Sequence, residues 1–433
     1  MEARLGDEYA AFLATYDVPP VKGLRVNRGY IEDSRLWALL GLPHAPIPYQ
    51  AGGYYYEGEA GKHPLHHAGA YYLQDPSAML TANAVDLPRG ARVLDLCAAP
   101  GGKSTALAAM IGEEGLLVAN EIDLGRAKVL MGNVERLGLR NVMVTSLPPD
   151  RVAATFGAIF DVVVVDAPCS GEGMFRKNPP AVEEWSMDNV AMCAMRQRDI
   201  LSCAARCVKE GGRLVYSTCT FAPEENEGSV DYLLSCGDFV GETPTDRVMA
   251  ATVGEGADFC RRFYPHLGQG EGHFVALARR VTPTDVPPKI EPLRLLKSAD
   301  ERACRDFFAE TLSAVPAGVL CYVGGQICLV PEDIPLPTRG VLSAGVKVGE
   351  AIARRNGVRV EPHHMFFKCM PLSGRLDLAL GDSRLAAYLH GESIDADLSD
   401  GYGVVCAEGC PVGGYKAVDG VLKNRYPKGL RTT

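Results

Sequence analysis

The chain has 433 residues, which is enough for two or three domains and at least one large hydrophobic core. With 47% hydrophobic and 22% charged residues it has the composition of a globular protein, and none of its apolar runs approaches the roughly 18 residues of a membrane span. The formal net charge of −9 excludes a protein that coats nucleic acid over its whole surface, but the acidic excess lies before residue 290, so the charge allows a local nucleic-acid site.

The cysteines indicate a reduced protein. Fourteen of them are scattered singly, and the closest pairs, Cys203/Cys207 and Cys406/Cys410, lack the two-residue spacing typical of structural zinc. The N-terminus, MEARLGDEYAAFLATY, is acidic and amphipathic and therefore does not resemble a secretory signal. We therefore expect a cytoplasmic protein that spans no membrane and binds no metal.

The predicted elements begin with a short amphipathic helix and then, over residues 31–75, short apolar runs interrupted by Gly and Pro. From about residue 90 onward, strands alternate with helices: ARVLDL, KSTALAAMI, GLLVANE, LGRAKVLMGNVERLG, NVMVT, FDVVVVDAP, a helix over Asn189–Glu210, and GRLVYSTCT. Continuous apolar strands that alternate with helices predict an α/β fold with a parallel sheet covered on both faces. EGHFVALARRV predicts one more strand, antiparallel to the others.

The second half of the chain divides at a Pro-rich stretch, TPTDVPPKIEP, which predicts a linker. A mixed segment follows it, and a small Gly-rich β module ends the chain. We therefore expect five parts: 1–75, 76–283, a linker over 284–292, 293–373 and 374–433.

Four chemically useful residues fall at the carboxyl ends of predicted strands: Asp95, Glu121, Asp166 and Cys219. In a parallel sheet these ends meet at one edge, where open α/β sheets bind their ligands. The segment DLCAAPGGKST follows the first strand, and its paired glycines let the backbone approach a ligand closely. It is not a phosphate loop, because Cys97 stands where that motif requires glycine. A nucleoside ligand whose ribose hydroxyls bind Glu121 is better supported.

Three longer segments carry a family resemblance. VLDLCAAPGGKST, VVVVDAPCSGEGMFRK and LVYSTCTFAPEENE, in this order, resemble the Sun (Nol/Nop/Sun) family of RNA cytosine-5 methyltransferases, and YYLQDPSAM and FYPHLGQGEGHFVA match its flanking motifs. The resemblance covers the whole chain. DEYAAFL, GLRVN and NRYPKGLR are similar to segments of bacterial RsmF-type 16S rRNA methyltransferases.

The resemblance implies a Rossmann-like class I methyltransferase sheet, a small N-terminal RNA-binding domain, and C-terminal mixed α/β and PUA-like β modules. It implies S-adenosylmethionine as the cofactor, with Glu121 at the ribose, Asp150 near the adenine and Asp166 between cofactor and base. The loop that matches the family's cofactor loop consists of Cys97, Ala98, Ala99, Pro100, Gly101, Gly102 and Lys103.

The resemblance also assigns chemistry to the two cysteines: Cys219 matches the nucleophile, and Cys169 the thiol that helps release the product. Carbon 5 of cytosine becomes nucleophilic only after a thiolate adds to carbon 6. A proton donor near nitrogen 3, supplied by Asp166 or Lys103, stabilises that adduct. The chemistry alone leaves the attacking thiol open, since Pro168-Cys169 resembles the Pro-Cys nucleophile of DNA methyltransferases, while STCT favours Cys219.

Two groups of basic residues are candidates for RNA contact. Near the site we expect phosphate contacts from Arg25, Arg176 and Lys177. In the terminal module Lys423, Arg425 and Lys428 lie among the aromatic residues Tyr415 and Tyr426, a pattern typical of RNA contact and base stacking.

The resemblance favours 16S rRNA, alone or in the small ribosomal subunit, as the partner of a monomeric enzyme. The alternatives are a tRNA cytosine-5 methyltransferase and a non-catalytic rRNA-binding assembly factor. A DNA substrate is disfavoured, because the terminal module resembles an RNA-binding fold.

Overall fold

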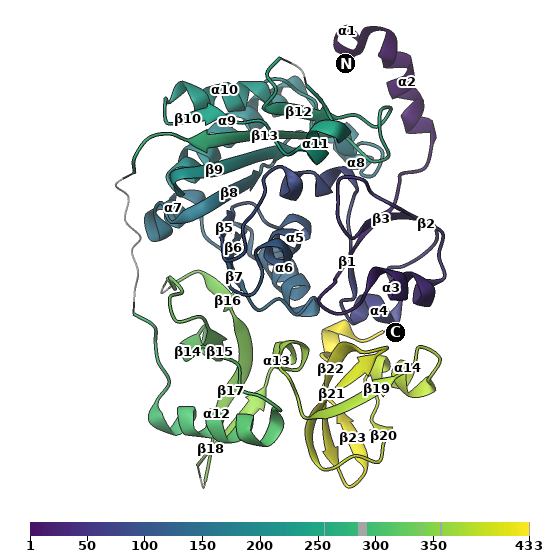
Figure 1. Cartoon of the computed structure of the whole chain (residues 1–433), viewed down its shortest axis with the longest axis vertical. Coiled ribbons are helices and arrows are strands. Elements are labelled where there is room, and N and C mark those ends of the chain that lie inside the picture. The colour runs from purple at the N-terminus through teal and green to yellow at the C-terminus, as the bar shows by residue number, and fades with distance from the viewer. Residues whose placement is uncertain (255, 285–291, 338, 356, 433) are drawn as a thin grey trace.

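Four β-sheets are formed by the residues that the computed structural model describes, which are 1–254, 256–284, 292–337, 339–355 and 357–432 (Figure 1). Residues 285–291 of the expected linker lie outside them. In Figure 1 the largest sheet occupies the upper half, and the mixed and terminal parts of the chain lie below it.

The largest sheet has the predicted parallel centre. Its neighbouring parallel strands, in spatial order, are β9 (Val208–Thr218), β8 (Phe160–Asp166), β5 (Arg92–Asp95), β6 (Leu116–Asn120) and β7 (Val142–Thr145). The expected antiparallel strand is β13 (His273–Arg280), which pairs with β9 on one side. It also pairs with β12 (Cys260–Phe263) and with β10 (Phe239–Gly241), and β12 in turn pairs with β11 (Val253–Gly254). The predicted α/β methyltransferase-like sheet is therefore confirmed.

Helices cover both faces of this sheet, which explains its continuous apolar strands. In β8, Val162 and Val164 pack in the core beneath α5 (Gly102–Ile111) and α6 (Leu124–Arg136), while Val163 and Val165 pack in the core on the other face. The helices of that second face are α7 (Pro149–Phe156), α9 (Met187–Ala205) and α10 (Glu227–Ser235).

Two details of the prediction are wrong. The helix expected to reach Glu210 ends at Ala205, and β9 already begins at Val208, which pairs with Phe160 at the base of β8. The chain also forms α7 where no helix was predicted. Pro149 occupies the first turn of that helix, where its missing N–H costs no hydrogen bond.

The mixed segment extends the large sheet. Helix α12 (Ser298–Thr311) packs on a sheet of β14 (Val319–Val323), β15 (Gln326–Val330), β17 (Val346–Arg354) and β18 (Gly357–Pro362). Strand β16 (Val341–Ala344) instead pairs antiparallel with β7. The expected boundaries of the five parts stay a prediction, because this pairing continues one sheet across two of them.

The N-terminal and C-terminal sheets share a hydrophobic core, in which Leu24 and Trp37 pack with Tyr388 and Tyr415. Figure 1 shows the C-terminus beside α3 (Asp33–Leu40) and α4 (Pro64–His67). The N-terminal sheet consists of β2 (His44–Pro46), β3 (Gly53–Tyr56), β1 (Gly23–Val26) and β4 (Tyr71–Leu73). The C-terminal sheet consists of β19 (Gly374–Leu378), β21 (Gly401–Ala407), β22 (Cys410–Val418), β23 (Val421–Asn424) and β20 (Ile394–Asp395), with α14 (Ser383–His390) beside it.

The remaining helices are short. Helices α1 (Glu2–Leu5) and α2 (Tyr9–Ala14) lead into the N-terminal sheet, and Phe12 of α2 packs against Phe221 and Tyr264 of the large domain. Helices α8 (Pro180–Glu184) and α11 (Asp246–Ala251) belong to the large domain, and α13 (His364–Cys369) connects the mixed segment to the terminal sheet.

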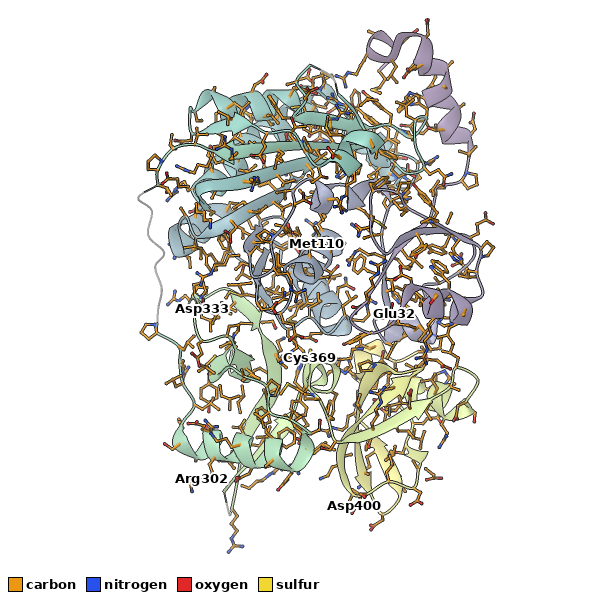
Figure 2. The ribbon with its side chains drawn as sticks, in the orientation of Figure 1. Glu32, Met110, Arg302, Asp333, Cys369 and Asp400 are labelled. Carbon is orange, nitrogen blue, oxygen red and sulfur yellow. The ribbon has the colours of Figure 1, made fainter. Side chains whose placement is uncertain are left out.

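A buried lysine joins three parts of the chain. Lys368 of α13 is 3% exposed, and its Nζ donates to the carbonyl oxygens of Ala68, at 2.5 Å, and of Pro411. The Tyr30 ring lies 5.2 Å from this nitrogen, and the Tyr30 hydroxyl donates to the carbonyl oxygen of Lys368. Cys369 marks this junction in Figure 2. Burial lowers the pKa of Lys368 from 10.5 to about 7, so a neutral amine with two N–H donors suits its two acceptors.

Replacing this lysine tests the junction. Because the folded pKa lies below the unfolded one, the contribution of Lys368 to stability is complete above pH 10.5 and is lost as the pH falls to about 7. The wild-type free energy of unfolding should therefore rise by about 1.4 kcal/mol per pH unit from this group. Lys368→Met should remove that part of the rise, as measured by urea unfolding at about pH 7.5 and about pH 9. Lys128→Met, on the exposed surface of α6, is the control. An unchanged pH dependence in Lys368→Met would contradict the assignment.

Candidate active site

Two cysteines meet at the carboxyl edge of the large sheet. The parallel register between β8 and β9 places Asp166 opposite Ser217, so the loops that follow the two strands leave the sheet at the same level. Cys169 follows Asp166 by three residues and Cys219 follows Ser217 by two, and their sulfur atoms lie 3.3 Å apart. Both side chains are only partly buried.

A charged pair lies beside the sulfurs. Lys103 Nζ donates to Asp166 Oδ2 at 2.7 Å, and Ser217 Oγ donates to Asp166 Oδ1 at 2.8 Å. Burial by itself would raise the pKa of Asp166, but the Lys103 ammonium outweighs it and holds that pKa below its ordinary value. Burial would lower the pKa of Lys103, but Asp166 raises it above its ordinary value. The pair is therefore an ammonium and a carboxylate at neutral pH.

The Cys169 thiol has a raised pKa. The hydrogen bond with Cys219 and, after it, burial raise the pKa of Cys169 well above its ordinary value. Cys169 therefore keeps its proton and can donate it toward the sulfur of Cys219.

Two cavities meet at these groups. The larger, about 730 Å³, has Glu121, Asp150, Cys169 and Cys219 among its lining residues. The smaller, about 310 Å³, is lined by Tyr72, Gln74, Asp75, Met174, His273 and residues of the 97–103 loop. Asp166 and Cys219 border both cavities, as do Cys97 and Ala99. Groups bound in the two cavities would therefore meet at the Cys219 sulfur.

The loop of residues 97–103 is held in place by backbone contacts. Ala98 N donates to the Asn120 carbonyl oxygen at 2.8 Å, Arg126 to that of Ala99 at 3.0 Å, and Asn133 to that of Pro100 at 2.9 Å. Gly101 has φ of +113°, a conformation that favours glycine, and α5 begins at the next residue. All seven predicted loop residues therefore lie on the edge that carries the cysteines.

Glu121 faces the larger cavity from the end of β6. It is 2% exposed and accepts from the backbone N–H of Asp123 at 3.1 Å, and it forms an ion pair with Arg126 at 3.2 Å. Asp150, in the first turn of α7, lines the same cavity. Sequence reasoning missed Arg196, Asp199 and Cys203, which also line it. Their spacing of three and four residues, on one face of a predicted helix, was the available signal.

The three basic residues expected near the site make internal contacts instead. Arg25 is 5% exposed and donates to Thr105 Oγ1 at 2.6 Å. Arg176 pairs with the buried Glu271 at 2.8 Å, and Lys177 pairs with Asp75. These cations join the N-terminal part to the large domain, so their side chains are already engaged and do not present a free surface to phosphate.

In the terminal module, Lys423 and Lys428 are exposed, as expected of phosphate contacts. Arg425 is partly buried and pairs with Glu361. The expected stacking by Tyr415 and Tyr426 is not supported, because the two side chains are 2% and 3% exposed and belong to the core shared with the N-terminal sheet. Instead, Lys416 Nζ lies 5.3 Å, and the Arg425 guanidinium 5.9 Å, from the centre of the partly exposed Tyr402 ring.

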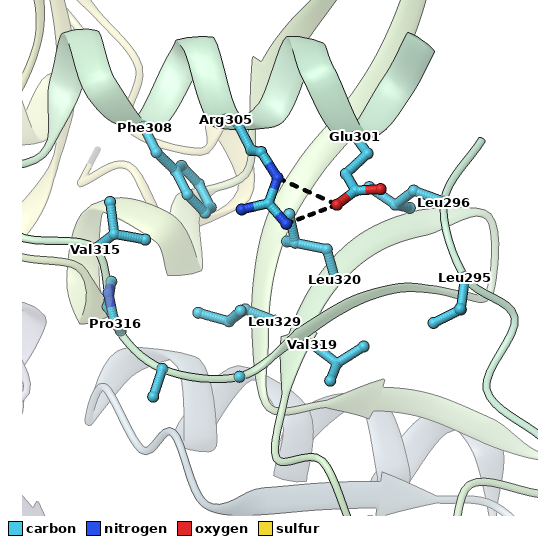
Figure 3. A pocket seen from close by; sticks show the side chains of 12 residues that line it. Leu295, Leu296, Glu301, Arg305, Phe308, Val315, Pro316, Val319, Leu320 and Leu329 are labelled. Atoms are coloured by element: carbon cyan, nitrogen blue, oxygen red, sulfur yellow. Dashed lines mark hydrogen bonds and ion pairs between the residues drawn. The ribbon is translucent and has the colours of Figure 1, made fainter. Parts of the chain in front are cut away.

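A further cavity of about 420 Å³ lies between α12 and β14, in the mixed segment. Figure 3 shows its apolar lining, with the ion pair of Arg305 and Glu301 at 2.6 Å on the helix side. It contains none of the predicted site residues. In the part of the chain that the structure describes, no cluster of three His, Cys, Asp or Glu side chains suits a metal ion, and no helix is long and apolar enough to cross a membrane.

Comparison with known families matches three parts of the chain. Residues 82–279 match the family described as 16S rRNA methyltransferase RsmB/F. Residues 1–76 match the N-terminal domain of 16S rRNA methyltransferase RsmF, and residues 375–432 match the methyltransferase RsmF PUA domain.

Among solved structures, a methyltransferase homolog protein from Pyrococcus horikoshii has a TM-score of 0.55 and 26% identity, covering 64% of this chain and 92% of that chain. NSun6 from Pyrococcus horikoshii, at a TM-score of 0.58 and 22% identity over 64% of this chain and 95% of that one, shares the fold.

Curated relatives match nearly end to end. Ribosomal RNA small subunit methyltransferase F of Erwinia tasmaniensis is 31% identical over 98% of this chain and 93% of its own length. The protein of the same name from Shewanella baltica is 30% identical over 97% of this chain and 92% of its own length. Together with the paired cysteines and the cavities that meet at Cys219, these matches show that the chain belongs to the RsmF family of methyltransferases.

Proposed function

We propose that this protein transfers a methyl group from S-adenosylmethionine to carbon 5 of a cytosine in 16S rRNA, through a covalent bond between Cys219 and carbon 6. The observation that carries the proposal is the 3.3 Å contact of two thiols beside the Lys103–Asp166 pair, where two cavities meet. The names of the relatives support rRNA as the substrate. A monomeric, cytoplasmic enzyme that needs no metal is part of the same proposal.

The larger cavity fits the cofactor. Its volume of about 730 Å³ is within the range that holds a drug-sized ligand. Glu121 would accept hydrogen bonds from the ribose hydroxyls, Asp150 would contact the adenine, and the 97–103 loop would hold the remainder. Bound there, S-adenosylmethionine supplies the methyl group that carbon 5 accepts. The smaller cavity is left for the cytosine, which must be unpaired or flipped out to enter it.

The raised pKa of the Cys169 thiol favours Cys219 as the nucleophile. Since Cys169 keeps its proton, it can donate a hydrogen bond to a thiolate on Cys219. A thiolate is the form of cysteine that attacks carbon 6. Lys103 is the better proton source for the base, because Asp166 is held as a carboxylate and is free to accept from the amino group of cytosine.

The same pair explains product release. Once the Cys219 sulfur is bonded to carbon 6 it carries no charge, so the largest cause of the raised pKa of Cys169 disappears. Cys169 then loses its proton to solvent, and its thiolate takes the proton of carbon 5. The electrons of that C–H bond form the double bond between carbons 5 and 6, and the electrons of the C–S bond leave with Cys219 as a thiolate.

Substitution of each cysteine tests the assignment. Cys219→Ala should lower methyl transfer to 16S rRNA by at least roughly a thousandfold while leaving cofactor binding intact, because it removes the nucleophile. Cys169→Ala should still attack but release slowly, so a covalent protein–RNA adduct should accumulate. Transfer of radiolabel to RNA and denaturing gels measure the two effects, with Cys236→Ala, an exposed cysteine, as the control. Full activity of Cys219→Ala would refute the mechanism. If the wild-type protein transfers label to tRNA alone, the tRNA alternative is favoured. If the wild-type protein transfers no label to RNA, an assembly factor is favoured.

Removal of the buried acid tests the cofactor site. Glu121→Ala should weaken the binding of S-adenosylmethionine by about tenfold to a hundredfold, the effect of losing hydrogen bonds to a charged group. Isothermal titration calorimetry measures the Kd. Glu113→Ala is a control outside the cavity, since that side chain is 72% exposed. An unchanged Kd in Glu121→Ala would place the ribose elsewhere.

The exposed lysines of the terminal module test the RNA surface. Lys423→Gln and Lys428→Gln should each weaken RNA binding and reduce the slope of log Kd against log salt concentration by about 0.7 to 0.9, the effect of one lost phosphate contact. Fluorescence anisotropy at several salt concentrations measures this slope, with Lys128→Gln on α6 as the control. If the slopes of both variants equal that of the wild type, these lysines do not contact phosphate.

A further inference from the structure

The loops that carry the two cysteines are tied to each other by their next residues. Ser170 follows Cys169 and Thr220 follows Cys219, and the two buried hydroxyl groups form a hydrogen bond of 2.8 Å. The backbone N–H of Gly173 donates to the Cys219 carbonyl oxygen at 2.8 Å. A side chain on Gly173 would meet that oxygen at 2.8 Å and the backbone of Gly272 at 2.7 Å. The loops are therefore in direct backbone contact.

A buried carboxylate from the second loop holds the first. Glu225, which is fully buried, accepts from the backbone N–H of Ser170 at 3.0 Å. It also accepts from the Gln197 amide at 2.7 Å, and the same amide nitrogen donates to the Pro168 carbonyl oxygen at 3.0 Å. These bonds fix Pro168 and Ser170, the residues on both sides of Cys169.

A carboxylate from the first loop holds the second in return. Glu172 accepts from the backbone N–H of Phe221 at 3.0 Å and from the Thr220 hydroxyl at 3.2 Å. Its other oxygen accepts from the indole N–H of Trp185 at 3.0 Å, which orients the carboxylate. These bonds fix Thr220 and Phe221, the two residues that follow Cys219.

We propose that Glu225 and Glu172 are reciprocal positioning residues: Glu225 holds Cys169 in place for the release of product, and Glu172 holds Cys219 in place for attack on the base. This inference rests on the proposed function and assigns the two steps to two separate side chains. Neither carboxylate contacts the reacting atoms. Each acts on a sulfur through the backbone of the opposite loop, so the 3.3 Å spacing of the thiols depends on both.

The two roles give opposite signatures. Without Glu225, the Ser170 N–H loses its acceptor and Cys169 moves relative to Cys219, while the Cys219 loop keeps its own carboxylate. Attack then proceeds and release slows, so the covalent adduct accumulates. Without Glu172, the Cys219 loop loosens and the adduct forms slowly. A carboxylate that merely stabilised the fold would slow both steps together.

The experiment measures the rate of adduct formation and the rate of its resolution on 16S rRNA, from quenched time courses on denaturing gels. Glu225→Ala should slow resolution by about tenfold or more, the effect of losing hydrogen bonds to a charged group, and should slow formation much less than resolution. Glu172→Ala should slow formation by about tenfold or more. Glu224→Ala, the exposed neighbour of Glu225, is the matched control.

Two further variants distinguish an effect on the position of Cys169 from an effect on folding. Both strong bonds to Glu225 converge on its Oε2, so Glu225→Gln can keep them through its one amide oxygen and should restore resolution to near the wild-type rate. Gln197→Met, which removes the bridge between Glu225 and Pro168, should slow resolution without creating a cavity. Thermal unfolding and cofactor affinity confirm that each variant is folded.

The outcomes separate this inference from the proposed function. Equal slowing of both steps, or unchanged rates in the folded variants, would overturn the reciprocal roles while wild-type methylation still stood. A wild-type protein that neither methylates RNA nor forms an adduct would overturn the proposed function itself.

Discussion

The parallel pairing of β8 with β9 is the constraint on which the site depends. Its register sets Asp166 opposite Ser217. Cys169 lies only three residues after Asp166, and Cys219 only two after Ser217, so the two thiols emerge close together. Strand β13 pairs along the other side of β9, so the strand that carries Cys219 is held on both edges. In a sheet, a shift by one residue turns every side chain to the opposite face, and here it would move Ser217 away from Asp166 and separate the sulfurs.

Contacts between parts that are distant along the chain connect the modules around this sheet. Strand β16 continues the sheet into the mixed segment, and Lys368 ties that segment to both the N-terminal and the C-terminal parts. The two terminal sheets share one core, in which Tyr415 and Tyr426 are buried. These contacts join the terminal module, whose exposed lysines we propose as RNA contacts, to the N-terminal sheet.

The sequence predicted the strands and the acids at their ends because continuous apolar runs have few alternatives to a covered parallel sheet. The sequence could not predict which acidic side chains the cationic side chains pair with. Arg176 and Lys177 find their acids at Glu271 and Asp75, about a hundred residues away along the chain, so their burial appears only in three dimensions. Helix α7 was not predicted, although proline suits a first helical turn. The sulfur spacing was likewise beyond the sequence, since it depends on register and on two distant glutamates.

The pairing of two thiols, rather than of a thiol with a carboxylate, follows from charge. A carboxylate in contact with Cys219 would oppose its ionisation by like-charge repulsion. In the proposed mechanism, a neutral Cys169 thiol instead stabilises a Cys219 thiolate by donating a hydrogen bond, and its own proton becomes available only after that thiolate has bonded to the base. The two carboxylates that hold the loops accept from backbone N–H groups and from an amide, a hydroxyl and an indole, and not from either thiol. The proposed mechanism thereby combines acidic side chains for positioning with a nucleophile that must carry negative charge.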